Sequence, residues 1–230
     1  RIANIVKDSF GFLGTSLILG LTLLMATHAS AQDIYEIEQT FDQPFNNLEI
    51  DKGWDARLIQ APKGSPTTVV LQTRCAGFFE EGNVPNIIEA KHLGPVGHLW
   101  LKENTTMPKS TVVEIHTAQP IKYLKLYKGA RLTIEQYDFD SVDLDIDADT
   151  GALLVIDTLH NLGKTHISLH DATLDLRHVN ANAINIWAHG NSVVNKGKQW
   201  SINQGRLYLS DSAVSNINAT DSANHLYVDH

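Results

Sequence analysis

The chain has 230 residues, of which 43% are hydrophobic and 19% are charged, and this composition excludes a disordered or low-complexity protein. Its 26 acidic residues outnumber its 18 basic residues, which leaves a formal net charge of -8. An acidic chain without a basic block is a poor partner for nucleic acid, whose affinity depends on neutralising phosphates. Cys75 is the one cysteine, so the sequence allows neither an internal disulfide nor a cysteine zinc site.

Residues 1–31 have the pattern of a secretory signal peptide. A short basic stretch precedes an apolar run over residues 10–26, and the small residues Ala29 and Ala31 fit the cleavage pattern of signal peptidase. We expect cleavage after Ala31. The alternative of an uncleaved membrane anchor stays open, although the apolar run over residues 10–26 is of marginal length for spanning a bilayer. The protein is therefore expected to be exported, to the periplasm, the outer membrane surface or the extracellular space.

Residues 32–230 are predicted to form one all-β domain. The part over 32–118 shows short strands of alternating polarity in an irregular order, separated by turn residues. In the part over 119–230, a unit of two alternating strands around a small or polar turn recurs about every 20 residues, which is typical of a β-solenoid. The alternative that fits the same strand lengths is a twisted β-sandwich.

Equivalent residues of successive solenoid coils should stack in columns one strand spacing apart. One inward column is predicted to contain Leu126, Ile146, Leu169, Ile186, Leu209 and Val228. A second is predicted to contain Leu124, Leu144, Ile167, Ile184, Leu207 and Leu226. A third, at a corner that admits only small side chains, is predicted to contain Ala130, Ala152, Ala172, Ser192 and Ala213.

An opening of the form F-x-x-L/I-x-I-x-x-G-x-x-x-x-L/I precedes a strand HLWLKE and the coil columns. The residues that match are Phe45, Leu48, Ile50, Gly53, Leu58 and Ile59, followed by Leu99 to Leu101. In these features the chain resembles the putative auto-transporter adhesin, head GIN domain family over about residues 41–230. The family's coils carry Gly-Ser-Gly turns, whereas this chain has turns such as Thr150-Gly151-Ala152, so it resembles a divergent member. The resemblance implies a right-handed β-solenoid at the cell envelope and little about activity.

Four aspartates alternate along one predicted strand, so that at least the first three share its outer face. Such a comb could hold calcium, which takes six to eight oxygen ligands, but neither the EF-hand spacing nor the solenoid calcium repeat is present. The alternative is a solvated face relieved by neighbouring coils, and we assign no metal and no cofactor. The aspartates are Asp143, Asp145, Asp147 and Asp149, and the neighbours expected for the first three are His166, Lys125 and His170, respectively.

The sequence carries no nucleophile elbow and no other catalytic motif. The strongest enzyme alternative is a carbohydrate-active β-helix, a polysaccharide lyase or hydrolase, because glycan cleavage can run on paired carboxylates. Such an enzyme needs long loops around its cleft, and the turns of the regular half are short. We therefore predict a protein that binds and does not catalyse.

Aromatic residues recur at the outward positions of the first strand in four of the six units. Rings mixed with hydrogen-bonding groups suit sugar stacking or a protein contact, so we predict a binding face for a glycan or an envelope protein. The alternative is that the rings only shield the sheet. The predicted binding residues are Tyr123, Tyr127, Trp187, Tyr208 and Tyr227.

The final unit shows one strand around Val228 and no polar capping repeat. A bare last coil exposes unpaired backbone and apolar side chains, so solenoids need caps. We expect this coil to be covered, by a second copy of the chain or by another segment.

Overall fold

The computed structural model describes residues 21–22, 34–74, 88–93, 96–103, 111–216 and 226–229, and these contain strands and turns but no helix. Most of the predicted signal peptide thus lies outside the described residues. The strands are β1 (Leu21–Thr22), β2 (Tyr35–Phe41), β3 (Asn47–Ile50), β4 (Asp55–Gln60), β5 (Thr67–Thr73), β6 (Ile88–Leu93), β7 (Val96–Leu101), β8 (Val112–Thr117), β9 (Tyr123–Leu126), β10 (Arg131–Asp138), β11 (Leu144–Ala148), β12 (Leu153–His170), β13 (Thr173–His189), β14 (Val193–Leu209), β15 (Val214–Ser215) and β16 (Leu226–Asp229).

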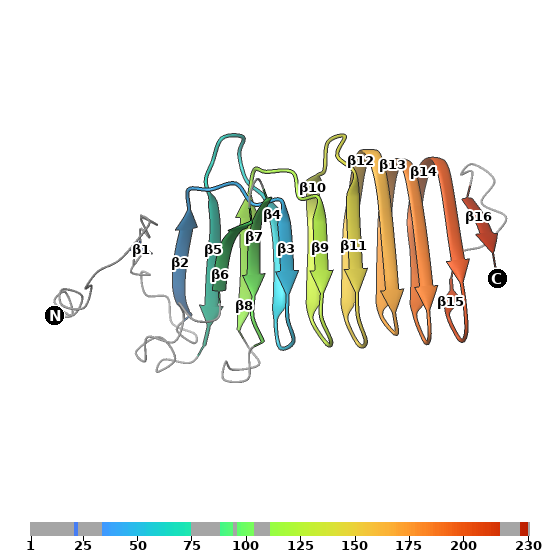
Figure 1. Cartoon of the computed structure of the whole chain (residues 1–230), viewed down its shortest axis with the longest axis horizontal. Helices are drawn as coiled ribbons and strands as arrows, with labels where there is room; N and C mark the ends of the chain where they lie inside the picture. The colour runs from blue at the N-terminus through green and yellow to red at the C-terminus, as the bar shows by residue number, and fades with distance from the viewer. Residues whose placement is uncertain are drawn as a thin grey trace.

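The predicted β-solenoid is confirmed, with about four turns and roughly 21 residues per coil. Strands of successive coils pair in parallel and lie side by side along the long axis of the molecule (Figure 1). One sheet, whose outer surface we call the first-strand face, contains β9, β11 and the C-terminal halves of β12, β13 and β14. The second-strand face belongs to β10 and the N-terminal halves of the same three strands.

The N-terminal strands extend both faces of the solenoid. Strand β3 pairs in parallel with β9 and with β7, and β4 pairs in parallel with β10 and with β8. Strands β2, β5 and β8 then add antiparallel pairs at that end. Most of the buried apolar side chains between Phe41 and Leu209 belong to one hydrophobic cluster, so the irregular part and the coils share a core.

Among the side chains that the structure describes, the inward residues are predicted correctly, but the predicted columns are shifted by two residues in every second coil. Leu124 lies opposite Ile146, which lies opposite Ile167 and not opposite Leu169. A slip of one residue would turn every side chain to the other face, whereas a slip of two keeps the same face inward. The apolar alternation therefore cannot detect it. The observed columns are Leu124, Ile146, Ile167, Ile186, Leu207 and Val228, and Leu126, Ala148, Leu169, Ala188 and Leu209.

The predicted column of small residues is confirmed. Its five members occupy one corner of successive coils, because the residues that follow them are paired in register. The first four are buried and the last packs against the core. A residue in the left-handed region precedes the column position in each turn, as at Gly129 and Gly151, both with φ of 73°, and at Asp171, with φ of 51°. Glycine reaches this region without steric cost.

A bend inside β12 carries the chain from the second-strand face to the first. The register shifts between Asn161 and Lys164, and a Cβ on Gly163 would lie 2.3 Å from the carbonyl oxygen of Val142. A glycine is therefore needed for the two coils to approach here. The fully buried Asn161 side chain donates to the Thr165 hydroxyl at 2.9 Å and accepts the Gly163 amide at 2.9 Å.

Strand β16 pairs with the C-terminal half of β14. Residues 217–225 between β15 and β16 lie outside the described part of the chain. The predicted cover of the last coil stays a prediction.

Candidate functional site

The structure places four of the five predicted binding residues on the first-strand face. Alternate side chains of a strand point to the same side of a sheet, and the inward positions between these residues are buried leucines, isoleucines and alanines. Tyr123 begins β9 and Tyr127 directly follows it, whereas Trp187 comes from β13 and Tyr208 from β14. Tyr227 pairs through its backbone with Arg206, and its side chain lies outside the described part of the structure. The four described rings thus fall into two separate pairs.

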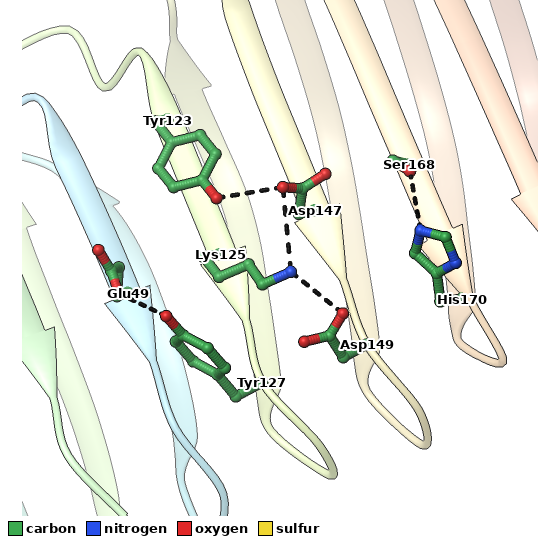
Figure 2. A network of polar contacts seen from close by, with 8 residues as sticks. All are labelled: Glu49, Tyr123, Lys125, Tyr127, Asp147, Asp149, Ser168 and His170. Carbon is green, nitrogen blue, oxygen red and sulfur yellow. Dashed lines mark hydrogen bonds and ion pairs between the residues drawn. The ribbon is translucent and has the colours of Figure 1, made fainter.

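Tyr123 of β9 and Tyr127, which directly follows this strand, belong to a polar network (Figure 2). The Tyr123 hydroxyl donates to Asp147 at 3.1 Å, and the Tyr127 hydroxyl donates to Glu49 at 2.8 Å. Both side chains are half-buried. Burial and then the charge of Asp147 raise the pKa of Tyr123, while burial and the hydrogen bond to Glu49 raise the pKa of Tyr127 to about 12. Their hydroxyl groups are engaged in holding β3, β9 and β11 together.

Lys125 lies at the centre of the aspartate comb. Its ammonium group lies 3.1 Å from Asp149 and 3.9 Å from Asp147 (Figure 2). Strand register pairs Lys125 with Asp147, and Asp145 with Tyr123 and His166, so the neighbours predicted for the comb were wrong by the same two residues as the columns. The remaining member, Asp143, accepts a hydrogen bond from the Lys164 amide at 3.1 Å. Within the described ranges, no three or more His, Cys, Asp or Glu side chains lie close enough together to hold a metal ion.

The raised pKa of Tyr127 predicts a loss of stability at alkaline pH. The folded protein holds this proton more tightly than the unfolded chain, in which tyrosine has a pKa of about 10. The contribution is therefore complete below about pH 10 and is lost as the pH rises towards the folded value of about 12. We expect Tyr127→Phe to flatten the fall in unfolding free energy over this range, measured by denaturant titration at several pH values.

Glu49→Gln is the matched variant for this experiment. It keeps the phenol but removes the charged acceptor, so the tyrosinate absorbance of Tyr127 should rise at lower pH than in the unmodified chain. An alkaline stability profile that is identical in Tyr127→Phe and the unmodified chain would contradict the assignment.

The second pair of rings is stacked, with Trp187 exposed and Tyr208 half-buried. The rings of Trp187 and Tyr208 lie 4.3 Å apart with an interplanar angle of 30°, and Trp187 is 39% exposed. His166 meets the Trp187 ring edge-on at 6.2 Å, and His189 lies 6.4 Å from it. Parallel pairing of β12, β13 and β14 holds these four rings on adjacent strands. They form a rigid aromatic platform, because the strands that carry them are paired on both sides.

A hollow of about 790 Å³ lies directly beside this platform. Ala183 forms the floor of the hollow, because it pairs with Lys164 on one side and with Gln204 on the other. Its methyl group therefore lies between two long side chains. Beyond Trp187 and Tyr208, its lining residues are Lys164, Ala183, Asn185, Asn203, Gln204, Gly205 and Arg206. The Arg206 guanidinium donates to the Tyr208 hydroxyl at 3.1 Å, which links the hollow to the platform. We call the platform and the hollow together the Trp187 site.

Sequence reasoning recognised two residues of this site and missed the rest of its lining. Asn185 and Arg206 are recognisable as outward residues, but only the true register places Asn185 between His166 and Arg206. Lys164 and Asn203 lie at the bends, where the apolar alternation is interrupted and carries no signal. Finding these lining residues would have required the correct strand register and the positions of the bends.

A second hollow of about 750 Å³ lies along the bend of the second-strand face. Its charged side chains are largely paired with one another. Arg177 contacts Asp157 at 3.2 Å, and His160 contacts Asp138 at 3.2 Å. The aromatic ring that lines it, Tyr137, is buried and donates its hydroxyl to the Gln119 carbonyl. None of its described lining residues is an exposed Trp, Tyr or Phe, so the Trp187 site is the better candidate.

None of the described segments forms a helix long and apolar enough to cross a membrane. No protein-family model matches the sequence, and no curated protein matches it significantly.

Comparison of the fold with solved structures finds similar proteins in Bacteroides and Parabacteroides. A protein of Bacteroides fragilis described as a "putative adhesin" superposes with a TM-score of 0.52 at 12% identity, over 86% of this chain and 94% of its own. A protein of Parabacteroides distasonis described as a "putative lipid binding protein" superposes with a TM-score of 0.51 at 8% identity, over 80% of this chain and 71% of its own. At these identities the likeness shows that the chain shares its β-solenoid fold with proteins described as adhesins and lipid-binding proteins.

Proposed function

We propose that this protein is an exported, non-catalytic binding protein of the cell envelope and that the Trp187 site holds a glycan. The observation that carries the proposal is the exposed Trp187 ring, stacked on Tyr208 at 4.3 Å beside a polar hollow. A flat aromatic face accepts the apolar face of a sugar ring, and the surrounding amides can hydrogen-bond its hydroxyl groups. Rings held by paired strands lose little conformational entropy on binding.

The chemistry of the hollow supports binding rather than cleavage. Glycoside hydrolases of the usual type need two carboxyl groups on either side of the scissile bond. The described lining of the Trp187 site contains amides, cations and aromatic rings, and neither Asp nor Glu is among its residues. The carboxylates of Asp147 and Asp149 elsewhere on this face are bound to Lys125 and Tyr123.

Export and the envelope location rest on the signal-peptide pattern of residues 1–31. One of the similar structures is described as a putative adhesin and another as a putative lipid binding protein. Their shared fold therefore favours a binding role but does not identify the ligand. The motif from Phe45 to Ile59 supports a closer relation to the head GIN domain family. Its leucine and isoleucine at positions 48 and 50 are buried in β3.

Trp187→Ala tests the proposed function. We expect retention on a glycan array by purified residues 32–230 to fall by at least about tenfold, which corresponds to about 1.4 kcal/mol of binding free energy. The unfolding free energy should fall by only about 0.5–1.5 kcal/mol, the usual contribution of an aromatic pair. Thermal unfolding of the same sample measures the second quantity.

Val214→Ala is the matched control, because Val214 is a 52% exposed apolar side chain of the second-strand face. It should leave retention unchanged. If Trp187→Ala lowers stability but leaves glycan or cell-surface attachment intact, the rings only shield the sheet and the proposal fails.

A further inference from the structure

The Trp187 site concentrates positive charge on an acidic protein. The chain carries a formal net charge of -8, yet the charged side chains that line this hollow are Lys164 and Arg206, both exposed. Three amide side chains accompany them, those of Asn185, Asn203 and Gln204. A neutral sugar would require only the amides and the aromatic platform.

The cation beside the platform has a defined position. Arg206 donates through one terminal nitrogen to the Tyr208 hydroxyl at 3.1 Å, and the Tyr208 ring stacks on Trp187 at 4.3 Å. A ligand ring that packs against the Trp187–Tyr208 pair would therefore lie near the guanidinium group that contacts the Tyr208 hydroxyl. Guanidinium groups match carboxylates in a planar, two-bond geometry, which an ammonium group does not provide.

Lys164 supplies the second cation from the far end of the hollow. It lies on the bend of β12, and Ala183 separates it from Gln204. Residues 183 and 187 of β13 lie about 13 Å apart, at about 3.3 Å per residue. An anionic group on a ring farther along the ligand would therefore meet Lys164 while the first ring packs against the Trp187–Tyr208 pair.

Carboxylates limit this positive region on both sides. Asp143 and Asp145 lie on the segment next to β12, and Asp229 of β16 lies opposite Tyr208. A long polyanion lying across the coils would meet these aspartates and be repelled. The positive region therefore fits a short acidic segment that runs along β13.

Resting on the proposed function, we infer that the ligand of the Trp187 site is an acidic glycan, with a sugar carboxylate bound to Arg206 and a second anionic group near Lys164. We expect both the aromatic platform and the charge to contribute to binding, because Tyr208 contacts both Trp187 and Arg206. The site should therefore discriminate between a uronate and its uncharged ester.

Three probes separate ring from charge in a calorimetric titration. Trigalacturonate carries both, its methyl ester carries the rings without the charge, and tricarballylate carries three carboxylates without a ring. We expect trigalacturonate to bind at least about tenfold more tightly than either of the others, a difference of about 1.4 kcal/mol.

Variants then show which basic side chains bind the carboxylates of the ligand. Arg206→Gln should weaken trigalacturonate by about tenfold and leave the ester within about twofold, whereas Trp187→Ala should weaken both. Lys164→Gln is the second variant and should also act on the acid alone. Arg131→Gln removes an equal charge from the exposed edge of the second-strand face and should leave all three affinities unchanged.

Equal affinity for the acid and its ester overturns the inference, and so does an Arg206→Gln protein that is folded and binds the acid normally. Failure of trigalacturonate to bind also overturns it, while retention of neutral glycans that depends on Trp187 would leave the proposed function standing. If tricarballylate binds as tightly as the acid, the site recognises small anions and not sugars. Capture of a protein ligand that Trp187→Ala abolishes, with no sugar bound, would overturn both.

Discussion

Ile146→Asp is expected to abolish folding. The Ile146 side chain is fully buried in β11, between Leu124 of β9 and Ile167 of β12. A carboxylate at this point would lose its hydration with no described cation among its column neighbours. The cost of more than about 4 kcal/mol is a large part of the stability of an ordinary domain. Circular dichroism and size-exclusion chromatography should show loss of the strand signal and an expanded or aggregated chain.

Two variants show whether this effect depends on the inward direction of the introduced carboxylate or on any change of side chain. Thr133→Asp introduces the same carboxylate at an outward position of β10, opposite Arg57, and should fold normally. Ile146→Val removes one methylene group and should cost about 0.5–1.5 kcal/mol. If Ile146→Asp folds with normal stability, the described core of the solenoid is wrong.

Trp54→Ala is expected to cost about 3–5 kcal/mol of unfolding free energy, the usual range for a buried large aromatic residue. Trp54 is 2% exposed, and its indole donates to the Lys102 carbonyl at 2.6 Å. Its own carbonyl accepts the Arg131 amide at 3.0 Å, which places Trp54 in register with Ala130 at the N-terminal end of the small-residue column. The substitution would leave a cavity where the N-terminal strands join the first regular coil.

Trp54→Phe separates packing from hydrogen bonding in this position. It keeps most of the ring volume and removes the indole N–H, so a smaller loss of about 1–3 kcal/mol is expected from the unpaired Lys102 carbonyl. Denaturant unfolding at equilibrium measures both variants. A loss below about 1 kcal/mol for Trp54→Ala would show that the corner does not depend on this side chain.

The sequence alone determined the direction of the side chains. Alternation with a period of two assigned the inward positions of the coils whose side chains the structure describes, and Leu126, Ile146, Leu169, Ile186 and Leu209 are all buried. It also determined the small-residue corner from Ala130 to Ala213, because the limited space at a tight turn restricts residue type more strongly than hydrophobicity does. Both signals come from the local geometry of one strand or one turn.

Register was decided by the tertiary structure. Sliding one coil by two residues keeps every apolar side chain inward, so the pairing of Ile146 with Ile167 depends on how each turn closes and on where the coil bends, as at Gly163. Ala148 and Ala188 occupy column positions that an apolar alignment fills with larger residues. The same two-residue difference changed the neighbours of each aspartate in the comb.

The same distinction between side-chain direction and strand register applies to the candidate site. That Trp187 and Tyr208 point outward follows from the sequence pattern, but their stacking requires β13 and β14 to pair with these two residues opposite each other. The pattern also placed Tyr123 and Tyr127 on the same face, and it could not show that Asp147 and Glu49 accept their hydroxyl groups. Which side chains share a face is a property of one strand. Which of them touch is a property of pairs of strands far apart in the chain, and only the packed coils decide it.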